Sequence, residues 1–347
     1  MDYKDINTYD YPLDESLIAQ VPIKERDHSK LLVVNKYDGK YKDEVFYNIK
    51  NYLHKGDTLV LNNTKVLPSR IIGYKEETNA KIEVLLLKEL ESNISECLVR
   101  PQKRVHKGTI IKFDDEFKCE VVDVFKDGIT HVKLVYSGIL VEHLDKVGAM
   151  PLPPYIHEKL KDNSRYNTVY AKREGSAAAP TAGLHFTKEL LSELESMGVN
   201  ILYVTLNVGL GTFRPVSESD ITHHDMHSEK YEITEEVANK LNECKKNGKR
   251  IICVGTTSLR TLEANISKYG EFKATVEETG IFIYPPYECK SADALITNFH
   301  LPKSTLLMLV SALSSKENIL NAYREAIKKD YRFFSFGDAM FITDLKE

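Results

Sequence analysis

The sequence changes its pattern of apolar residues near residue 66 and again at residues 150–154. Between these points, short apolar runs recur at a spacing of roughly 8 to 12 residues, which is typical of a small antiparallel barrel or sandwich. The runs cover residues 70–74, 81–87, 96–100, 108–113, 118–125 and 130–136. We expect turns at Gly73, Gly108, Gly128 and Gly138, because glycine accepts the backbone conformations that tight turns need.

The central segment ends in a cluster of prolines. Pro151, Pro153 and Pro154 lie within four residues, and such a cluster continues neither a strand nor a helix. On either side, in residues 1–65 and 151–347, apolar strands alternate with amphipathic helices, which indicates an α/β layer with at least partly parallel pairing. The predicted fold is therefore an α/β domain with a mixed sheet built from both chain ends. Residues 66–150 are inserted into it as a small antiparallel β-barrel domain.

Residues that commonly cap helices stand before several of the amphipathic segments. The expected caps and helices are Thr187 for residues 188–197, Thr234 for 235–246, Ser304 for the apolar stretch after it, and Ser314, in a capping box with Glu317, for 317–328. Further helices are expected over residues 15–20 and 259–266. Strands are expected over residues 31–34, 58–61, 201–206, 250–254, 280–284 and 294–298.

Length and composition limit the classes of function. The 347 residues suffice for about two domains, and 47 Lys+Arg against 51 Asp+Glu give a net charge of −4. The chain therefore does not hold polyanions by bulk charge, although a local basic patch stays open. Five cysteines without C-x-x-C spacing fit reduced thiols. The N-terminus is acidic, and the longest apolar stretch, residues 306–313, is far short of a membrane span, so we expect a cytoplasmic protein without membrane contact.

Two predicted strand ends carry polar residues suited to a ligand. After strand 250–254 a glycine allows a tight turn, and hydroxyls lie beside the free N–H groups of a helix start, which suits a carboxylate, a phosphate or ribose hydroxyls. The second strand end, that of strand 294–298, lies at the carboxyl edge, where α/β sheets bind ligands. The candidates are Gly255, Thr256, Thr257, Ser258 and Arg260 at the first, and Asn298 and His300 at the second. A plain helix cap explains the polar residues at the first strand end equally well, and hydrogen bonds to the loop backbone explain those at the second.

Two loops are rich in small residues, which let a backbone approach a ligand closely. Residues 174–186 include His185, a candidate acid or base, but a tightly packed loop around a core histidine is an equal alternative. Residues 206–215 combine Gly209 and Gly211 with the forked donor Arg214. A G-x-G pattern without a further glycine is weak support for nucleotide binding.

Residues 223–229 hold three histidines and two carboxylates. Such a set can bind a metal, but the spacings of known zinc motifs are missing. A polar loop whose histidines bond to the backbone is the simpler interpretation. A third interpretation is that His227 or Glu229 serves as a proton-transfer group.

One basic run lies inside the predicted barrel. Four of the eight residues 100–107 are Lys or Arg and none is acidic, so a barrel can present them to a phosphate backbone. They are Arg100, Lys103, Arg104 and Lys107, and Lys65, Arg70 and Arg173 extend the patch. A solvated turn is the alternative.

Taken together and in order, eight stretches closely resemble the S-adenosylmethionine:tRNA ribosyltransferase-isomerase family of queuosine biosynthesis. They are residues 61–68, 177–187, 208–215, 226–229, 254–260, 281–286, 293–305 and 333–340. The resemblance implies an enzyme that transfers and isomerises the ribosyl moiety of S-adenosylmethionine onto the aminomethyl group of a deazaguanine at the wobble position of tRNA. The products are epoxyqueuosine-tRNA, adenine and methionine. The resemblance also implies a monomer with an inserted barrel, no metal, and no cofactor beyond S-adenosylmethionine as co-substrate.

This chemistry needs at least two proton-transfer groups, one at the carbon beside the sulfonium and one for the departing adenine. The candidates are His185, His227, Glu229 and Asp338. Substrate binding is assigned to Gly255, Thr256, Thr257, Ser258, Arg260, Asn298, His300 and Arg214, and tRNA binding to Lys65, Arg70, Arg100, Lys103, Arg104, Lys107 and Arg173. The rival functions are an S-adenosylmethionine-dependent RNA methyltransferase and a non-enzymatic RNA-binding protein. We expect moderate, salt-sensitive tRNA binding.

Overall fold

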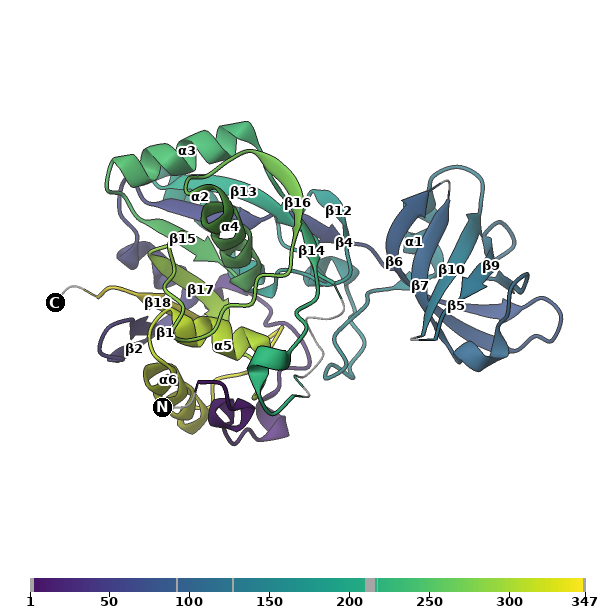
Figure 1. The fold of residues 1–347 in the computed structure, drawn as a ribbon, viewed down its shortest axis with the longest axis horizontal. Helices are drawn as coiled ribbons and strands as arrows, with labels where there is room; N and C mark the ends of the chain where they lie inside the picture. The colour runs from purple at the N-terminus through teal and green to yellow at the C-terminus, as the bar shows by residue number, and fades with distance from the viewer. Residues whose placement is uncertain (1–2, 92, 127, 210–215, 217, 346–347) are drawn as a thin grey trace.

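The protein is represented by a computed structural model that describes residues 3–91, 93–126, 128–209, 216 and 218–345. It consists of a layered α/β body and a barrel that stands to one side of it (Figure 1). Both ends of the chain lie in the α/β body, and the barrel is formed by the segment between them.

The α/β body is built on a nine-stranded mixed sheet. In spatial order its strands are β16 (Thr275–Thr279), β14 (Glu229–Ile233), β13 (Asn200–Leu206), β3 (Thr58–Asn62), β15 (Ile251–Val254), β17 (Ala294–Asn298), β18 (Ala339–Thr343), β1 (Lys30–Asn35) and β2 (Tyr41–Val45). Strands β13, β3, β15 and β17 run parallel, and β18 is antiparallel to β17. The carboxyl ends of these parallel strands and the start of β18 therefore lie at one edge of the sheet.

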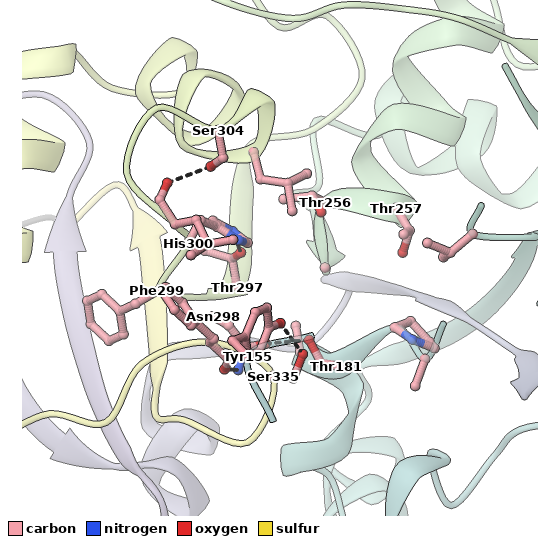
Figure 2. Close-up of a pocket in the computed structure, with 18 residues that line it drawn as sticks. Tyr155, Thr181, Thr256, Thr257, Thr297, Asn298, Phe299, His300, Ser304 and Ser335 are labelled. Carbon is pink, nitrogen blue, oxygen red and sulfur yellow. Dashed lines mark hydrogen bonds between the residues drawn. The ribbon is translucent and has the colours of Figure 1, made fainter. Parts of the chain in front are cut away.

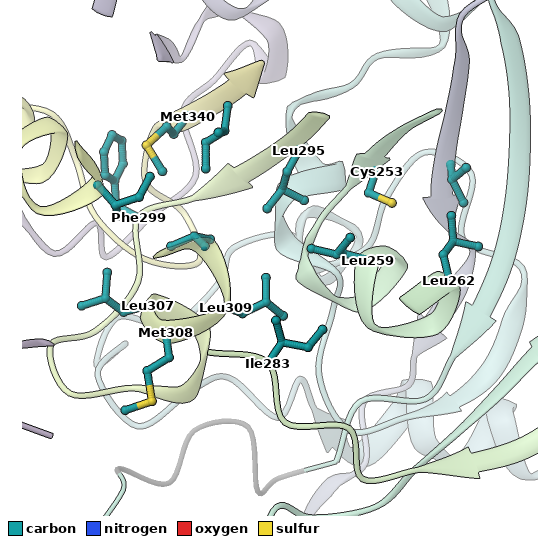
Figure 3. Close-up of a cluster of buried hydrophobic side chains, with 14 of the residues drawn as sticks. Cys253, Leu259, Leu262, Ile283, Leu295, Phe299, Leu307, Met308, Leu309 and Met340 are labelled. Carbon is teal, nitrogen blue, oxygen red and sulfur yellow. The ribbon is translucent and has the colours of Figure 1, made fainter. Parts of the chain in front are cut away.

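Helices cover both faces of this sheet, so its central strands are apolar on both sides. In β1, Leu32 and Val34 pack into one core while Leu31 and Val33 pack into the other. The first core, shown in part in Figure 3, is covered by α3 (Glu235–Lys246), α4 (Thr256–Tyr269), α5 (Thr305–Ala312) and α6 (Lys316–Lys328). The second is covered by α2 (Lys188–Ser196) and the 3-10 segment η4 (Phe46–Tyr52).

The barrel is a six-stranded antiparallel sheet that closes on itself through the pairing of β5 with β8. Its strands, in spatial order, are β5 (Arg70–Lys75), β6 (Lys81–Glu91), β7 (Ile94–Arg100), β10 (Ile129–Val135), β9 (Lys118–Val124) and β8 (Ile110–Lys112), with the short β11 (Gly148–Ala149) added to β5. Helix α1 (Leu140–Val147) packs its Leu144 into the barrel core. A separate parallel pair, β4 (Thr64–Val66) with β12 (Arg173–Ser176), adjoins the α/β body.

The predicted fold class is confirmed: a mixed sheet drawn from both chain ends carries an inserted antiparallel barrel. The division at residues 65/66 and 150/151 stays a prediction. The local signal was accurate for α3, because Thr234 accepts a hydrogen bond from the Val237 amide and α3 spans the predicted residues. None of the helices in the described ranges is long and apolar enough to cross a membrane.

Several local predictions were wrong. Gly73 lies inside β5 rather than in a turn. A glycine fits there because a β-carbon would come within 2.6 Å of Ile111, where β5 and β8 close the barrel. Residues 140–147 form helix α1, although the whole segment was expected to be β. Residues 15–20 contain only the 3-10 turn η2 (Glu15–Leu17), and residues 280–284 have no regular structure because the strand ends at Thr279. The cap of α6 is Ser315, not Ser314.

Candidate active site

A pocket opens at the carboxyl edge of the parallel strands, where β15, β17 and the start of β18 meet (Figure 2). It measures about 690 Å³, counting its open mouth. Residues 179–182, 255–257 and 297–301 form most of its walls, and Tyr155 and Ser335 face each other across a 2.7 Å hydrogen bond between their hydroxyls. This is the position at which open α/β sheets bind ligands.

One wall of the pocket is the start of α4. Gly255 has φ +85°, a conformation that favours glycine, and the next residues, Thr256 and Thr257, line the pocket. The Thr257 hydroxyl is buried and has no hydrogen-bond partner in the described part of the chain. Ser258 does not line the pocket, and its hydroxyl donates instead to the carbonyl of Val254, at the end of β15, at 2.9 Å. The helix start thus offers free N–H groups and one unsatisfied hydroxyl to a ligand.

A second wall is built on Asn298, which is 2% exposed. Its carbonyl oxygen accepts from Thr181 Oγ1 at 3.2 Å, and its amide nitrogen lies 3.3 Å from His185 Nε2 and donates to the Phe334 carbonyl at 3.1 Å. His185 Nδ1 lies 2.7 Å from Ser29 Oγ. When Asn298 donates to Nε2, the ring proton sits on Nδ1 and Ser29 accepts it.

His185 is a buried ring rather than an exposed acid or base. It stacks on Phe46 at 4.9 Å, and desolvation, helped by the charges of Arg332 and Arg26, lowers the pKa of His185 from 6.5 to about 3. His300 lines the pocket, and desolvation likewise lowers its pKa to about 3. Its Nε2 lies 2.7 Å from Thr297 Oγ1. Both rings are therefore neutral at pH 7 and act there as hydrogen-bonding groups.

Glu229, Arg260 and His227 form a charge cluster beneath the pocket's helix. Arg260 stands one turn after Thr256 on α4, and its guanidinium pairs with the buried Glu229 of β14. Glu229 also contacts His227 Nε2 at 3.2 Å and accepts from the Gly209 amide at 2.9 Å. Burial alone would raise the pKa of Glu229, but the His227 hydrogen bond and the Arg260 charge lower it overall. The carboxylate is therefore ionised at neutral pH.

Arg260 keeps spare donors. Its side chain is 3% exposed, and its Nε and Nη2 have no hydrogen-bond partner among the residues that the structure describes. Arg260 does not line the pocket itself. Arg214, the other arginine predicted for substrate binding, lies outside the described residues.

Asp338 is occupied by backbone groups. Its two carboxylate oxygens accept from the Lys30 amide at 2.9 Å and the Arg332 amide at 2.7 Å, and it does not line the pocket. The structure therefore places this catalytic candidate where it ties β1 to the segment before β18.

The histidine-rich stretch does not converge on one point. His224 pairs with Glu218 at 3.2 Å, whereas His227 pairs with Glu229. Within residues 3–91, 93–126, 128–209, 216 and 218–345, no group of three His, Cys, Asp or Glu side chains is placed to hold a metal ion.

The predicted tRNA-binding residues are mostly exposed and are spread over the barrel and the neighbouring strand pair β4 and β12. Arg100 ends β7, Lys103 and Arg104 lie in the turn η5 (Gln102–Arg104), and Lys107 follows 3.6 Å from Asp123. The other three each have a carboxylate partner: Lys65 with Glu174, Arg70 with Glu83, and Arg173 with Glu232. Of these seven predicted residues, the ones without such a partner among the described residues are Arg100, Lys103 and Arg104 of the barrel run.

Comparison with known proteins identifies the family. The family described as queuosine biosynthesis protein matches residues 6–342. The chain belongs to this family. An S-adenosylmethionine:tRNA ribosyltransferase-isomerase of Staphylococcus haemolyticus is 57% identical over 97% of this chain and 99% of its own length. One of Staphylococcus aureus is 55% identical with the same coverage. A crystal structure of S-adenosylmethionine tRNA ribosyltransferase from Thermotoga maritima is 39% identical, covers 96% of this chain and 99% of its own, and superposes with a TM-score of 0.56.

The sequence singled out only part of this queuosine-family pocket. Asn298, His300, Gly255, Thr256 and Thr257 line it as candidates. Seven other polar or aromatic lining residues were not named as site candidates: Tyr155, Thr181, Thr297, Phe299, Ser304, Phe334 and Ser335. Six of these seven fall in the stretches 177–187, 293–305 and 333–340 that carry the resemblance, but their types and spacing alone suggest no ligand.

Proposed function

We propose that this chain is an S-adenosylmethionine:tRNA ribosyltransferase-isomerase. It transfers and isomerises the ribosyl moiety of S-adenosylmethionine onto the aminomethyl-deazaguanine at the wobble position of tRNA, with release of adenine and methionine. The observation that carries the proposal is the 57% identity, over 97% of the chain, to a relative of that name. The pocket at the carboxyl edge supports it, because it combines helix N–H groups, hydroxyls and amide groups suited to a nucleoside.

Within this proposal, S-adenosylmethionine binds at the start of α4. The buried Thr257 hydroxyl and the first N–H groups of the helix suit the methionine carboxylate or ribose hydroxyls. Asn298 and His300 lie on the facing wall, where neutral donors and acceptors are able to read a base edge or a ribose. Arg260 does not line the pocket and acts on the substrate indirectly, because it holds Glu229 in place.

We assign proton transfer to His227 with Glu229. Glu229 is kept ionised by Arg260 and orients the His227 ring, which is 24% exposed and therefore open to substrate or solvent. A carboxylate that holds one nitrogen of a histidine fixes the ring's tautomer and stabilises its protonated form. His185, with both nitrogens engaged and a pKa of about 3, is assigned to positioning Asn298 instead.

The tRNA approaches from the barrel side in this proposal. The base to be modified must leave the stack of the anticodon loop to reach an enclosed site. The exposed cations Arg100, Lys103, Arg104 and Lys107 hold the tRNA backbone, while the body keeps its net charge of −4. We propose that the enzyme works in the cytoplasm as a monomer without a metal.

One incubation separates the three candidate functions. The purified chain is mixed with S-adenosylmethionine and tRNA bearing the aminomethyl-deazaguanine, and the small molecules are identified by mass spectrometry. We expect adenine and methionine in equal amounts, with the RNA gaining the mass of the transferred group. S-adenosylhomocysteine would show a methyltransferase instead, and RNA binding without consumption of S-adenosylmethionine would show a binding protein. A reaction without tRNA is the control.

A further inference from the structure

A second, smaller pocket lies behind the first one. It measures about 270 Å³, counting its open mouth. Arg26, Arg165, His185 and Ser335 are among its lining residues. Ser335 also lines the larger pocket, and His185 touches Asn298 of that pocket at 3.3 Å. The two pockets are therefore separated by little more than one layer of side chains.

Three arginines gather at this small pocket from segments far apart in the sequence. Arg26 belongs to η3 (Arg26–His28) and Arg165 to η6 (Asn163–Tyr166), and both line the pocket. Arg332 lies beside it, since its Nη1 donates to the carbonyl of Val21, next to the lining residue Pro22. The charges act on the pocket itself: Arg332 and Arg26 both help to lower the pKa of His185, and Arg165 helps to lower that of Arg26.

The positive charge is poorly compensated. In the described part of the chain no carboxylate lies within 4 Å of the Arg26 or Arg165 guanidinium. Arg332 has one, Asp338 at 3.6 Å, but that carboxylate already accepts two backbone N–H groups. Asp162 accepts from the Ser164 amide and forms no ion pair within 4 Å with these arginines, although its charge acts on Arg165 and Arg26 at longer range. Like charges held together at a pocket cost free energy unless an anion joins them.

The guanidinium groups are fixed in place by carbonyl oxygens. Arg26 donates to the carbonyls of Leu184, Ser164 and Asn167, and Arg165 donates to those of Ile23 and Lys24. Among the described residues, Arg165 Nε is buried without a hydrogen-bond partner, and Arg332 Nη2 makes the 3.6 Å ion pair with Asp338 but no hydrogen bond. Carbonyl bonds account for the positions of the arginines, but they leave the unused Arg165 donor and the weakly compensated charge unexplained.

We propose that this cluster, Arg26, Arg165 and Arg332, binds one phosphodiester group of the tRNA backbone next to the modified nucleotide. The inference rests on the proposed function. A planar guanidinium matches the oxygens of a phosphate, and arginines held in advance lose little freedom on binding. A base inserted into the larger pocket carries its own backbone with it, so a phosphate next to it comes within reach of the adjoining pocket. The site fixes the substrate beside the reaction, whereas the barrel run holds the tRNA at a distance.

The test uses the full chain and an anticodon stem-loop RNA that carries the deazaguanine. Each phosphodiester flanking the modified nucleotide is replaced in turn by a neutral methylphosphonate, and affinity is measured by fluorescence anisotropy. We expect one replacement to weaken binding by about 10-fold, as for loss of a charge-assisted contact, and to lower the slope of log affinity against log salt by roughly 0.7. This arm needs no protein variant.

The arginines are then tested as partners of that phosphate. In Arg165→Gln and Arg332→Gln, the unmodified RNA should bind about 10-fold more weakly, and the methylphosphonate should cause little further loss. Arg324→Gln, which removes an exposed arginine of α6 that donates to Asn321, should retain the full effect of the methylphosphonate. Urea midpoints check that each variant is folded. If Arg165→Gln is unfolded, Arg165→Lys, which keeps the charge but not the fork, takes its place.

The outcomes separate this proposal from the proposed function. Equal loss from the methylphosphonates in wild type and arginine variants, or no loss at any position, overturns the phosphate site. So does a 10-fold loss of S-adenosylmethionine affinity by calorimetry in Arg165→Gln with unchanged RNA affinity, since the anion would then be the methionine carboxylate. Absence of adenine and methionine from the wild-type reaction overturns the proposed function and leaves the RNA-binding results standing by themselves.

Discussion

The pocket at the sheet edge and the basic run on the barrel are both polar, but they are built in opposite ways. In the pocket region several polar side chains are buried and held by specific partners, as Glu229 is held by Arg260, His227 and the Gly209 amide. On the barrel, Lys103 and Arg104 are exposed in a short turn, and Lys107 faces Asp123 at 3.6 Å in solvent. Buried polar groups depend strongly on their partners, whereas exposed charges act through a screened field. The first arrangement suits chemistry and the second suits reversible attachment.

The largest expected difference concerns the removal of a carboxylate from each region. Glu229→Ala leaves Arg260 buried without its partner, and such a loss costs about 3–5 kcal/mol of the free energy of unfolding. Asp123→Ala removes the exposed partner of Lys107, which is worth at most about 1 kcal/mol. Urea unfolding of the two variants measures both values. Equal losses would contradict the contrast between the two regions.

The second prediction concerns catalysis alone. His227→Ala removes the proposed proton-transfer ring, and loss of a general acid or base lowers turnover by about 10²–10⁴-fold. Because the ring is partly exposed, we expect the variant to fold and to bind tRNA as the wild type does. Adenine release at saturating substrates is the measurement, and urea unfolding checks the fold.

The matched control is His224→Ala in the same loop, whose ring pairs with Glu218 and packs on Phe282 away from Glu229. It should keep turnover within a few-fold of wild type. Wild-type turnover in His227→Ala would remove this histidine from the mechanism.

How far the sequence predicts the fold depends on the range of the interaction. The α3 helix was located residue for residue because its cap, Thr234, acts three residues away. Gly73 was misplaced because the contact that demands glycine comes from Ile111, on a strand that is distant in sequence and meets β5 only when the barrel closes. The cap at Ser315 rather than Ser314 also depends on tertiary structure, since Ser314 donates instead to the Lys36 carbonyl.

The same limit applies to the candidate site. His185 was a reasonable acid or base by residue type, but burial and the charges of Arg332 and Arg26 lower its pKa and keep it neutral. Its ring is held by Phe46 and by Ser29, 156 residues earlier in the chain. Asp338 was a candidate because a carboxylate can move protons, yet its oxygens are taken by two amides. The cluster of Arg26, Arg165 and Arg332 had no sequence signal at all, since no two of its members are near each other along the chain.

The third prediction concerns the barrel. The double variant Lys103→Gln with Arg104→Gln should weaken tRNA binding by about 10-fold at low salt and lower the slope of log affinity against log salt by roughly 1.4, two single-strand phosphate contacts. Turnover at saturating tRNA should not change, because neither residue lies at the pocket. The control is Lys133→Gln, an exposed barrel lysine outside the run. A fall in turnover at saturating tRNA would show that the barrel takes part in the chemical step.

The last prediction concerns how the buried His185 changes the free energy of unfolding as the pH is lowered. The folded chain holds His185 neutral with a pKa of about 3, whereas the unfolded chain titrates near 6.5, so the unfolded chain binds more protons between these values. The free energy of unfolding must therefore fall as the pH drops below about 6.5, by up to about 1.4 kcal/mol per pH unit from this residue. Urea unfolding between about pH 7 and pH 5 should show a shallower fall in His185→Gln than in the wild type.

His106→Gln, in the basic run, is the control for the substitution itself, because this ring is exposed to solvent. If instead His185→Gln retained the full slope, the histidine behind Asn298 would take up its proton in the folded state. Its assignment as a neutral positioning residue would then give way to a role as an acid.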